Sequence, residues 1–481
     1  MTPSYGTLFA TEPQGHCKSQ CTLSAPSMIN EVTLVSDLTE APARLPSKLD
    51  KIGRSVQRKA AVRLIPVIAI GYTLAFVDRT NISFASLQMN RDLHFSASVY
   101  GFGAGLFFVG YALCEVPSNM LLLHFGARRW LARITFTWGI IAAAMMFVQT
   151  PAQFYSMRLL LGMAEAGFFP GVLYYLTLWF PVRARARAVS RFFIAAPLSA
   201  VLSGSLAGWL LGLNGKLGLA GWQWLFLVEG LPSVAVGLLI LEILPDKPRD
   251  ASWLTVDEKD WLEYRLKVDA SGAHLGHQTR VVDALLSPRV WMIGSFFFCA
   301  QLAISAYTFY APAILQSVTG WSVRSVGFLV ACLGLAGAAA MLLNGAHSDR
   351  MGERTLHSVV PCLVMCVGFM CASYFRSPWV VVGALALTFL AYNALQAPAL
   401  ALPTQFLAGR AAAAGLAGMN TITMLSGFVG AYWMGLARDA TGSDQAGLRG
   451  LTLPCLACVT LMYCLSRNLR PSSATQLAGN S

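Results

Sequence analysis

The chain has 481 residues, of which 56% are hydrophobic and only 12% are charged, and its mean hydropathy is +0.56. This composition excludes a soluble globular protein, in which about 25% of residues are charged. The formal net charge of +12 suggests nucleic acid as one partner. The basic residues, however, gather in short loops between long apolar stretches, and mainly on one side of them. We therefore interpret the charge as a topology signal and expect no nucleic-acid partner.

Twelve apolar stretches lie between about residue 63 and residue 466. A hydrocarbon core of ~30 Å requires about 20 residues of helix, and each stretch is long enough. Basic clusters such as Arg128/Arg129 and Arg183–Arg191 fall in loops that share one side, which the positive-inside rule identifies as cytoplasmic. The sequence therefore predicts an all-α membrane protein with twelve transmembrane helices and both termini in the cytoplasm.

Polarity divides the chain into five parts. Residues 1–60 are polar and contain no apolar stretch that suits a signal peptide, so we expect a disordered cytoplasmic tail. A start that is not used in the cell, with Met28 as one alternative first residue, also accounts for its composition. The other parts are a six-helix bundle at 61–244, a cytoplasmic linker at 245–288, a second six-helix bundle at 289–468 and a cytoplasmic tail at 469–481.

Two pairs of opposite charges lie in the spans of the first bundle. Asp78 and Arg79 interrupt the first span, and Arg158 and Glu165 lie within the fourth. An ionised side chain at mid-membrane depth costs at least about 2.5 kcal/mol, so such groups usually face a polar cavity. The spacing of Arg158 and Glu165 places both on one face of a helix, about 10 Å apart along its axis. Two cations and two acids predict a site that binds an anion and handles a proton.

The chemistry of these groups suggests a role for each. An arginine never deprotonates and can donate two parallel hydrogen bonds to a carboxylate, so we expect Arg79 and Arg158 to bind an organic anion. We expect Asp78 and Glu165 to exchange the proton. An anion that neutralises an arginine removes a charge that opposes protonation of the acids, so the two binding events favour each other. The alternative is that Asp78–Arg79 and Arg158–Glu165 are internal ion pairs that hold helices together.

Other polar side chains at membrane depth are weaker candidates for substrate binding. They are Tyr111 in the second span, Gln301 and Tyr307 in the seventh, Asn393 and Gln396 in the tenth, and Asn420 in the eleventh. Each is about as able to hydrogen-bond a neighbouring helix as to contact a substrate. The sequence contains no P-loop, dinucleotide fingerprint, nucleophile motif or set of metal ligands, so we expect no enzyme activity, no cofactor and no metal.

The loops after the second and the eighth span share a pattern. The later loop contains Gly345, Asp349, Arg350, Gly352 and Arg354, and the earlier one keeps Gly126, Arg128 and Arg129 but has no Asp. The same loop at the same position of each half implies repeated bundles, as in transporters that rock one bundle against the other. We therefore expect these loop residues to act in the conformational change.

The linker contains a short predicted helix. Thr255 and Glu258 have the spacing of a capping box, in which the two side chains satisfy free amides of the first helical turn. Trp261, Leu262 and Leu266 follow at helical spacing. We expect them to give this helix an apolar face on the membrane surface.

The spans and loops together resemble the major facilitator superfamily, and longer strings resemble its anion:cation symporter family. The strings are Leu74–Ala85, Cys114–Asn119 with Gly126–Arg133, Arg158–Gly171 and Gly221–Pro232. They cover most of the N-terminal half, and the branch they are most similar to contains tartrate, phthalate and 4-hydroxyphenylacetate transporters. The resemblance implies the major facilitator fold, proton coupling through Asp78 and Glu165, and carboxylate binding through Arg79 and Arg158.

Two departures from the family bear on the substrate. Phe76 stands where sugar-acid members tend to have a Tyr, and Phe192-Phe193 lies in the fifth span, where those members carry an amide. Fewer polar partners favour a flat, apolar acid, unless these phenylalanines face lipid. We expect a monomeric symporter in a bacterial inner membrane that imports a dicarboxylate or aromatic carboxylate with protons. Its expected partners are this anion, protons and the lipid bilayer. Proton-coupled efflux of a small metabolite or drug is the alternative.

Overall fold

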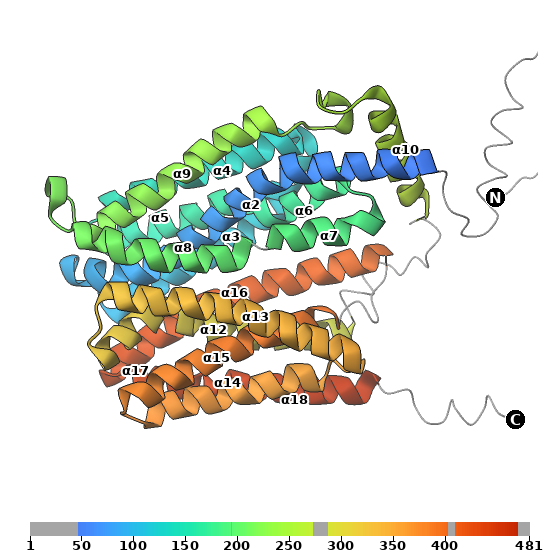
Figure 1. Cartoon of the computed structure of the whole chain (residues 1–481). Coiled ribbons are helices and arrows are strands. Elements are labelled where there is room, and N and C mark those ends of the chain that lie inside the picture. The colour runs from blue at the N-terminus through green and yellow to red at the C-terminus, as the bar shows by residue number, and fades with distance from the viewer. Residues whose placement is uncertain (1–46, 194, 273–286, 403–408, 470–481) are drawn as a thin grey trace, which may run out of the picture. The chain divides into compact units, whose positions relative to one another are not determined.

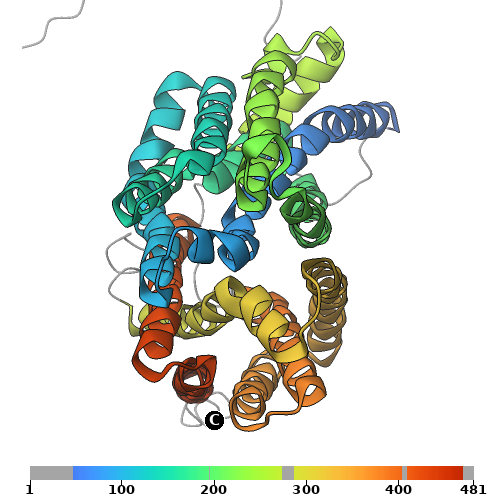
Figure 2. The same cartoon turned by 90° about the vertical axis from the view of Figure 1, so that its left-hand side faces the viewer.

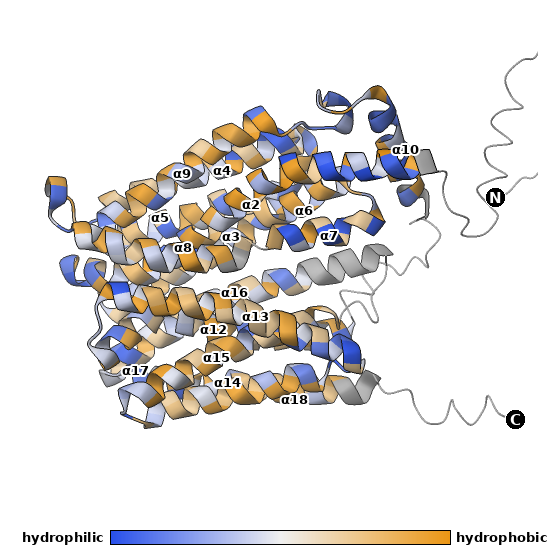
Figure 3. Cartoon of the chain, in the orientation of Figure 1, coloured by the Kyte–Doolittle hydropathy of each residue, from blue (hydrophilic) through white to orange (hydrophobic). Residues whose placement is uncertain are grey.

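The computed structural model describes residues 47–193, 195–272, 287–402 and 409–469, and every regular element in these ranges is a helix. Eleven helical segments of the described chain are long and apolar enough to cross a membrane. In addition, α16 (Gly409–Thr441) occupies the position of the predicted eleventh span, 411–436. The predicted all-α membrane fold is confirmed. Apolar residues dominate the middle of the helices, and hydrophilic residues gather in α10 and at the beginning of α7 (Figure 3).

The helices form two groups, seen end-on in Figure 2. The first contains α2 (Ser47–Asp92), α3 (Ala97–Phe125), α4 (Ala127–Ala144), α5 (Pro151–Glu165), α6 (Phe168–Trp179), α7 (Val182–Phe193), α8 (Ala195–Leu210) and α9 (Gly221–Ile243). The second contains α12 (Pro288–Thr319), α13 (Val323–Met351), α14 (Leu356–Tyr374), α15 (Pro378–Leu400), α16, α17 (Asp444–Gly450) and α18 (Thr452–Leu469). The two groups meet where α3 packs on α16 and where α8 packs on α13.

The first helix is longer than the sequence analysis predicted. Residues 47–60 were assigned to a disordered tail, but they form the first turns of α2. Val56 and Ala60, one turn apart, are fully buried there, so this segment has an apolar face that packs inside the protein. The predictions for residues 1–46, including an alternative start at Met28, and for residues 470–481 lie outside the described residues, as does the linker segment 273–286.

Glycines bring the two groups of helices into backbone contact. A Cβ atom on Gly101 of α3 would overlap the carbonyl oxygen of Ala431 in α16. Similarly, a Cβ on Gly204 of α8 would overlap the carbonyl oxygen of Gly327 in α13. Small residues of this kind allow membrane helices to approach closely. We call these two contacts, α3 with α16 and α8 with α13, the glycine seams.

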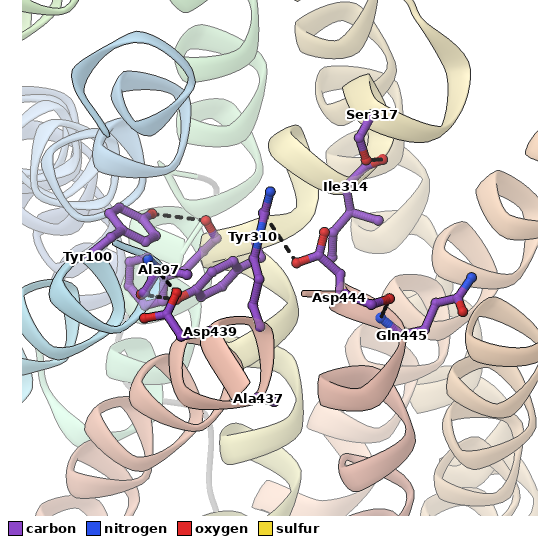
Figure 4. A network of polar contacts seen from close by, with 12 residues as sticks. Ala97, Tyr100, Tyr310, Ile314, Ser317, Ala437, Asp439, Asp444 and Gln445 are labelled. Atoms are coloured by element: carbon purple, nitrogen blue, oxygen red, sulfur yellow. Dashed lines mark hydrogen bonds and ion pairs between the residues drawn. The ribbon is translucent and has the colours of Figure 1, made fainter. Parts of the chain in front are cut away.

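Hydrogen bonds join the two groups at the end of the helices remote from α10 (Figures 1 and 4). The Asp439 carboxylate of α16 accepts the backbone N–H of Ala97 at the start of α3, at 3.1 Å. The Tyr310 hydroxyl of α12 donates to the carbonyl oxygen of Ala97 at 3.0 Å, and the Tyr100 hydroxyl of α3 donates to that of Phe309 at 2.9 Å. The two halves are therefore in direct polar contact at this end.

The linker helix α10 (Val256–Gly272) is bound to two helices of the first group. The predicted capping box is confirmed, since the Glu258 carboxylate accepts the Thr255 N–H at 3.0 Å and the Glu258 N–H donates to the Thr255 hydroxyl at 3.4 Å. The same carboxylate pairs with Lys59 of α2 at 2.8 Å. Asp269, near the other end of α10, accepts the backbone N–H of Val182 at the start of α7, at 2.7 Å.

The apolar face of α10 does not lie on the membrane surface, so that prediction was wrong. Leu262 is fully buried. The ring of Trp261 lies so close to Gly53 of α2 that a Cβ on this glycine would be 2.5 Å from it. The reason is the early start of α2, because its additional turns supply a protein surface for this face to cover.

We predict that Glu258→Gln destabilises the protein in a pH-dependent way. Burial raises the pKa of Glu258, but hydrogen bonds from Lys59, Thr255 and Ser55 lower it by more, so the pKa lies below its ordinary value. The ionised carboxylate therefore stabilises the fold at neutral pH, and this contribution is lost as the pH falls through the lowered pKa. In thermal unfolding, the variant should be less stable by about 1 kcal/mol at neutral pH.

The difference between variant and parent should shrink below about pH 4. Glu242→Gln, at an exposed position near the end of α9, is the control and should match the parent throughout. A difference that stays constant down to low pH would show that the Glu258 charge is not responsible.

Candidate substrate and proton site

A break in the fourth span positions the first site residue. The fourth predicted span consists of two helices, α5 and α6, and Glu165 is the last residue of α5. The chain turns at Gly167, whose φ of 86° lies in the region that favours glycine. The Ser118 hydroxyl of α3 donates to the carbonyl oxygen of Ala166 at 2.7 Å and so satisfies an acceptor at the break. Glu165 is therefore held at a helix end within the membrane span.

Arg79 and Glu165 form an ion pair between α2 and α5. The Arg79 Nη2 and Nε atoms lie 2.6 Å and 2.7 Å from Glu165 Oε1. Glu165 is completely buried, whereas the Arg79 side chain keeps 16% of its surface exposed. Neither internal pair that the sequence offered as an alternative, Asp78–Arg79 or Arg158–Glu165, is present. Breaking a buried pair on one side typically costs about 3–5 kcal/mol.

Aromatic rings surround the Arg79 guanidinium. Its central carbon lies 5.0 Å from the ring centroid of Tyr111, 5.4 Å from that of Phe107 and 5.5 Å from that of Phe76. At such distances a ring face attracts a cation. Tyr111, a predicted candidate, is therefore beside Arg79. The site at this point combines a cation with flat apolar surfaces.

The phenylalanines of the fifth span differ in their surroundings. Phe192 is fully buried and its ring centroid lies 4.5 Å from that of Tyr72, which in turn contacts Phe76 at 4.9 Å. Phe193 is 39% exposed. Phe192 and Phe76 thus belong to one aromatic cluster inside the protein, and the lipid-facing alternative does not apply to Phe192.

Arg158 also lies against the ring of Phe107. Its guanidinium carbon is 5.1 Å from the Phe107 ring centroid, and its Nη2 donates to the carbonyl oxygen of Ala104 at 3.1 Å. The side chain is completely buried, and its Nε and Nη1 atoms have no hydrogen-bond acceptor among the described residues. The structure thus brings both predicted cations against one ring. Unused donors on a buried arginine leave it able to bind further acceptors.

Asp78 faces away from its neighbour Arg79. Its Oδ2 atom accepts the indole N–H of Trp138 in α4 at 3.0 Å and the Ser233 hydroxyl of α9 at 3.3 Å. The side chain is 1% exposed. The two adjacent charged residues of α2 therefore contact different helices. Asp78 contacts α4 and α9, and Arg79 contacts α5.

A buried acid that the sequence analysis did not select lies near Asp78. Glu229 of α9 is 2% exposed and precedes Ser233 by one helical turn. Glu229 could have been selected from the sequence, because an acid inside an apolar span usually indicates a functional site. The sequence analysis includes Glu229 only within the family-like string Gly221–Pro232 and assigns it no role.

The candidates from the seventh and tenth spans form a separate polar group. The Tyr392 hydroxyl of α15 donates to Gln301 Oε1, and Gln301 Nε2 donates to the Ser305 hydroxyl at 2.9 Å. Tyr392 was not predicted, although Gln396 follows it by one turn and lies beside it. Tyr307 is buried, with its ring centroid 6.3 Å from that of Phe389.

The two asparagine candidates have partners on helices. Asn393 Nδ2 donates to the carbonyl oxygen of Phe389 at 2.9 Å, and its amide lies against Gly337 of α13. Asn420 Nδ2 of α16 donates to Glu115 Oε1 of α3 at 2.8 Å. Asn420 therefore connects the two halves, and both residues sit where helices meet.

The loop residues lie at the ends of helices. At Gly126, where φ is 87°, the Arg128 N–H donates to the Asp246 carboxylate at 3.0 Å, so Asp246 supplies the acid that this loop lacks. In the later loop Arg354 lies 3.8 Å from Asp349 and donates to the carbonyl oxygen of Ala401 at 2.8 Å. Gly352, with a φ of 63°, ends α13; Gly345 lies inside this helix, and Arg129 and Arg350 are exposed.

Comparison with known proteins shows the family of this chain. The model of the Major Facilitator Superfamily matches residues 68–431. The chain belongs to the major facilitator superfamily. It is 45% identical over 394 residues to a protein of Agrobacterium vitis named "Putative tartrate transporter", covering 82% of this chain and 90% of the relative. It is 38% identical to the "Quinolone resistance transporter" of Acinetobacter baumannii, covering 85% of this chain and 94% of the relative.

A solved structure of the superfamily has the same fold. It is a bacterial homologue of the human lysosomal transporter Spinster in an inward-facing and occupied conformation, with a TM-score of 0.70 and 16% identity. The alignment covers 85% of this chain and 98% of that structure. The predicted fold and the transporter class are thus confirmed, and the protein is a multi-pass membrane transporter rather than an enzyme.

We predict that Gly162→Ala disrupts the site through packing alone. Gly162 lies between Arg158 and Glu165 on α5, and a Cβ there would overlap the carbonyl oxygen of Phe107 in α3. The helices must separate, which should lower the stability by about 1–3 kcal/mol. The control is Gly383→Ala in α15, where no atom lies within 4 Å of the new Cβ. Thermal unfolding in detergent distinguishes the two, and equal melting temperatures would contradict the packing argument.

Proposed function

We propose that this transporter is a proton-coupled symporter that imports an organic anion, such as a dicarboxylate or an aromatic carboxylate, across a bacterial inner membrane. The observation that carries the proposal is that two arginines lie against the ring of Phe107, one of them ion-paired with Glu165. A planar guanidinium suits a carboxylate, and two of them suit an anion with two acidic groups or one acid and a polar substituent.

Arg79 is the first contact that we assign to the anion. It is the more exposed arginine, since its side chain keeps 16% of its surface accessible while Arg158 is completely buried. A substrate carboxylate at Arg79 competes with Glu165 for the same N–H groups. An ionised Glu165 without a cation is costly in this buried position, so the displaced acid takes up a proton. Anion and proton then bind together, as symport requires.

The surroundings of Arg79 favour a substrate with a flat or small apolar body. Phe76, Phe107 and Tyr111 present ring surfaces to the guanidinium. Aromatic rings in offset or edge-to-face contact stabilise one another, so an aromatic acid gains binding energy here that a polyhydroxy acid does not. The relative named for tartrate transport supports a dicarboxylate.

In the proposed mechanism, the two groups of helices give alternating access to the site. With the α10 side taken as cytoplasmic, the polar contacts between Asp439, Tyr310 and Ala97 close the periplasmic end. In the proposed cycle these bonds break and the glycine seams separate as the halves rock. The loop residues Arg128 and Arg354, which bind carbonyl or carboxylate oxygens at the cytoplasmic ends, would then change partners.

We predict different losses for the cation and for the acid. Arg79→Ala should weaken anion binding by at least about 2 kcal/mol, because the anion enters a desolvated site without its counter-charge. Glu165→Gln should retain binding and exchange but abolish accumulation driven by a proton gradient, since an amide cannot release a proton. Binding is measured by thermal shift and accumulation in proteoliposomes. The control, Arg187→Ala, changes an exposed arginine of α7 and should behave like the parent.

Three results would contradict these predictions. Uptake that a protonophore leaves unchanged would refute the coupling, and accumulation by Glu165→Gln at the parent level would assign this acid a structural role. Normal affinity in Arg79→Ala would move the anion site elsewhere.

We predict that a panel of carboxylates identifies the substrate class. A ligand at 100 times its dissociation constant stabilises the folded state by about 2.7 kcal/mol, which a thermal shift detects. Aromatic monocarboxylates and short dicarboxylates should stabilise the protein, and neutral polyols of the same size should not. Stabilisation by polyols alone would contradict an arginine-based site.

Efflux is a second candidate because one relative, 38% identical, is named for quinolone resistance. In that case, deletion should increase the sensitivity of the cell to an exported compound without reducing the uptake of any carboxylate.

A further inference from the structure

The buried charges of the first group of helices do not balance. Within its membrane spans, Asp78, Glu165 and Glu229 are buried carboxylates, whereas Arg79 and Arg158 are the cations at this depth. Arg79 and Glu165 neutralise each other. If all three acids were ionised, the single positive charge of Arg158 would have to offset the two negative charges of Asp78 and Glu229. Glu115, which is 7% exposed and bonded to Asn420, adds a further acid and no cation.

Asp78 and Glu229 belong to one cluster between α2 and α9. Ser233, one turn after Glu229, donates to Asp78 at 3.3 Å, so the α9 face that carries Glu229 is the face turned to Asp78. Asn81, about one turn after Asp78 on α2, lies beside the Glu229 carboxyl group, and the two carboxylates are close enough to interact electrostatically. The cluster therefore has two contributing residues from α2 and two from α9.

Several oxygen atoms of this cluster lack a well-aligned donor. Asp78 Oδ1, Asn81 Oδ1 and both carboxylate oxygens of Glu229 have no well-aligned hydrogen bond within the described part of the chain. The three side chains are between 1% and 2% exposed, so bulk water does not reach them. Buried polar atoms in proteins are nearly always hydrogen-bonded, and a buried ionised carboxylate without a partner is very costly. These four oxygen atoms can therefore accept a further donor.

We propose that Asp78 and Glu229 form a proton-binding site, separate from the Arg79–Glu165 pair, in which Glu229 carries the proton. Protonation forms one O–H bond on a Glu229 oxygen and removes its negative charge, with the proton coming from water. The new O–H is a donor for Asp78 Oδ1 or Asn81 Oδ1, which both lack one. Asp78 remains the ionised partner because Trp138 and Ser233 already donate to its other oxygen. Two carboxyl groups that share one proton are a recurring arrangement in proteins.

The groups around this site connect it to the arginines. Glu165 and Arg158 of α5 act electrostatically on Asp78, the former as a like charge and the latter as an opposite charge. The neighbouring groups on α4 and α9 are Trp138 and Ser233. An anion bound at Arg158 would offset the cation that acts on Asp78 and would thereby favour a proton in the shared site. This last step rests on the proposed function, whereas the proton site itself does not.

Infrared spectroscopy of the purified protein without substrate tests the site directly. The parent at neutral pH should show the carbonyl stretch of a buried, protonated carboxylic acid. Glu229→Gln should lose this band, and the matched control Glu242→Gln, at the exposed end of the same helix, should keep it. Absence of the band from the parent, or its persistence in Glu229→Gln, overturns the proposal.

A second variant tests whether the proton is shared, and it also serves if Glu229→Gln does not fold. Asp78→Asn should keep the band of Glu229 but shift its frequency, because the partner of the O–H has changed. An unshifted band would show that Asp78 does not take part and would overturn the shared site.

A sodium ion is the other way to satisfy these oxygens, and a thermal shift in sodium chloride against choline chloride separates the two. Equal stability in both salts is expected for a proton. Stabilisation by sodium that Glu229→Gln abolishes, without a carboxylic acid band in the parent, would replace the proton site by a cation site.

Transport assays then connect the site to coupling. Glu229→Gln should retain binding and counterflow exchange, but its accumulation should fall to the level that the parent reaches without a pH gradient. Full accumulation would exclude this proton from the cycle and overturn its role in coupling. If the parent itself is not driven by protons, the proposed function fails, while the infrared result on the site stands independently.

Discussion

The ion pair between Arg79 and Glu165 is the interaction on which the arrangement of the first half depends. Two opposite charges within membrane spans must meet, and their meeting fixes the rotation of α2 relative to α5. The break at Gly167 ends α5 at Glu165, and Gly162, one turn earlier, lets α3 approach closely enough for Phe107 to contact both arginines. The aromatic cluster and the position of Arg158 follow from these contacts.

The two halves contribute different chemistry. Among the described residues, the buried charges at membrane depth lie in the first half, whereas the second half contributes neutral groups such as Gln301 and Tyr392. Asn420 of the second half is hydrogen-bonded to Glu115 of the first half. A substrate between the halves would therefore be bound by charge on one side and oriented by hydrogen bonds on the other. Because Arg79 and Glu165 both lie in the first half, rocking need not separate this ion pair, whereas it would separate Glu115 from Asn420.

Much of the fold and of the candidate site was predictable from local signals in the sequence. Hydropathy located the spans, and charges within apolar stretches indicated Asp78, Arg79, Arg158 and Glu165. The partners were not predictable, because the pairing of Arg79 with Glu165 and the turning of Asp78 towards α9 depend on helix rotation and on contacts far apart in sequence. Glu229 was missed although its signal was of the same kind. The predicted position of the apolar face of α10 is wrong because the sequence analysis does not predict the additional turns of α2 that this face covers.

The glycine seams have a consequence for how the protein changes shape. At Gly101 of α3 and Gly204 of α8, backbone lies against backbone across the boundary, whereas Phe102 of α3 packs on aromatic rings of α16 beside the first seam. Interlocked side chains must change rotamer before two helices can slide, and each change adds to the activation barrier. The glycines lower this resistance at the points where backbone lies against backbone. A larger residue in a seam would instead act as a wedge and bias the population of states towards the one that is open at that end.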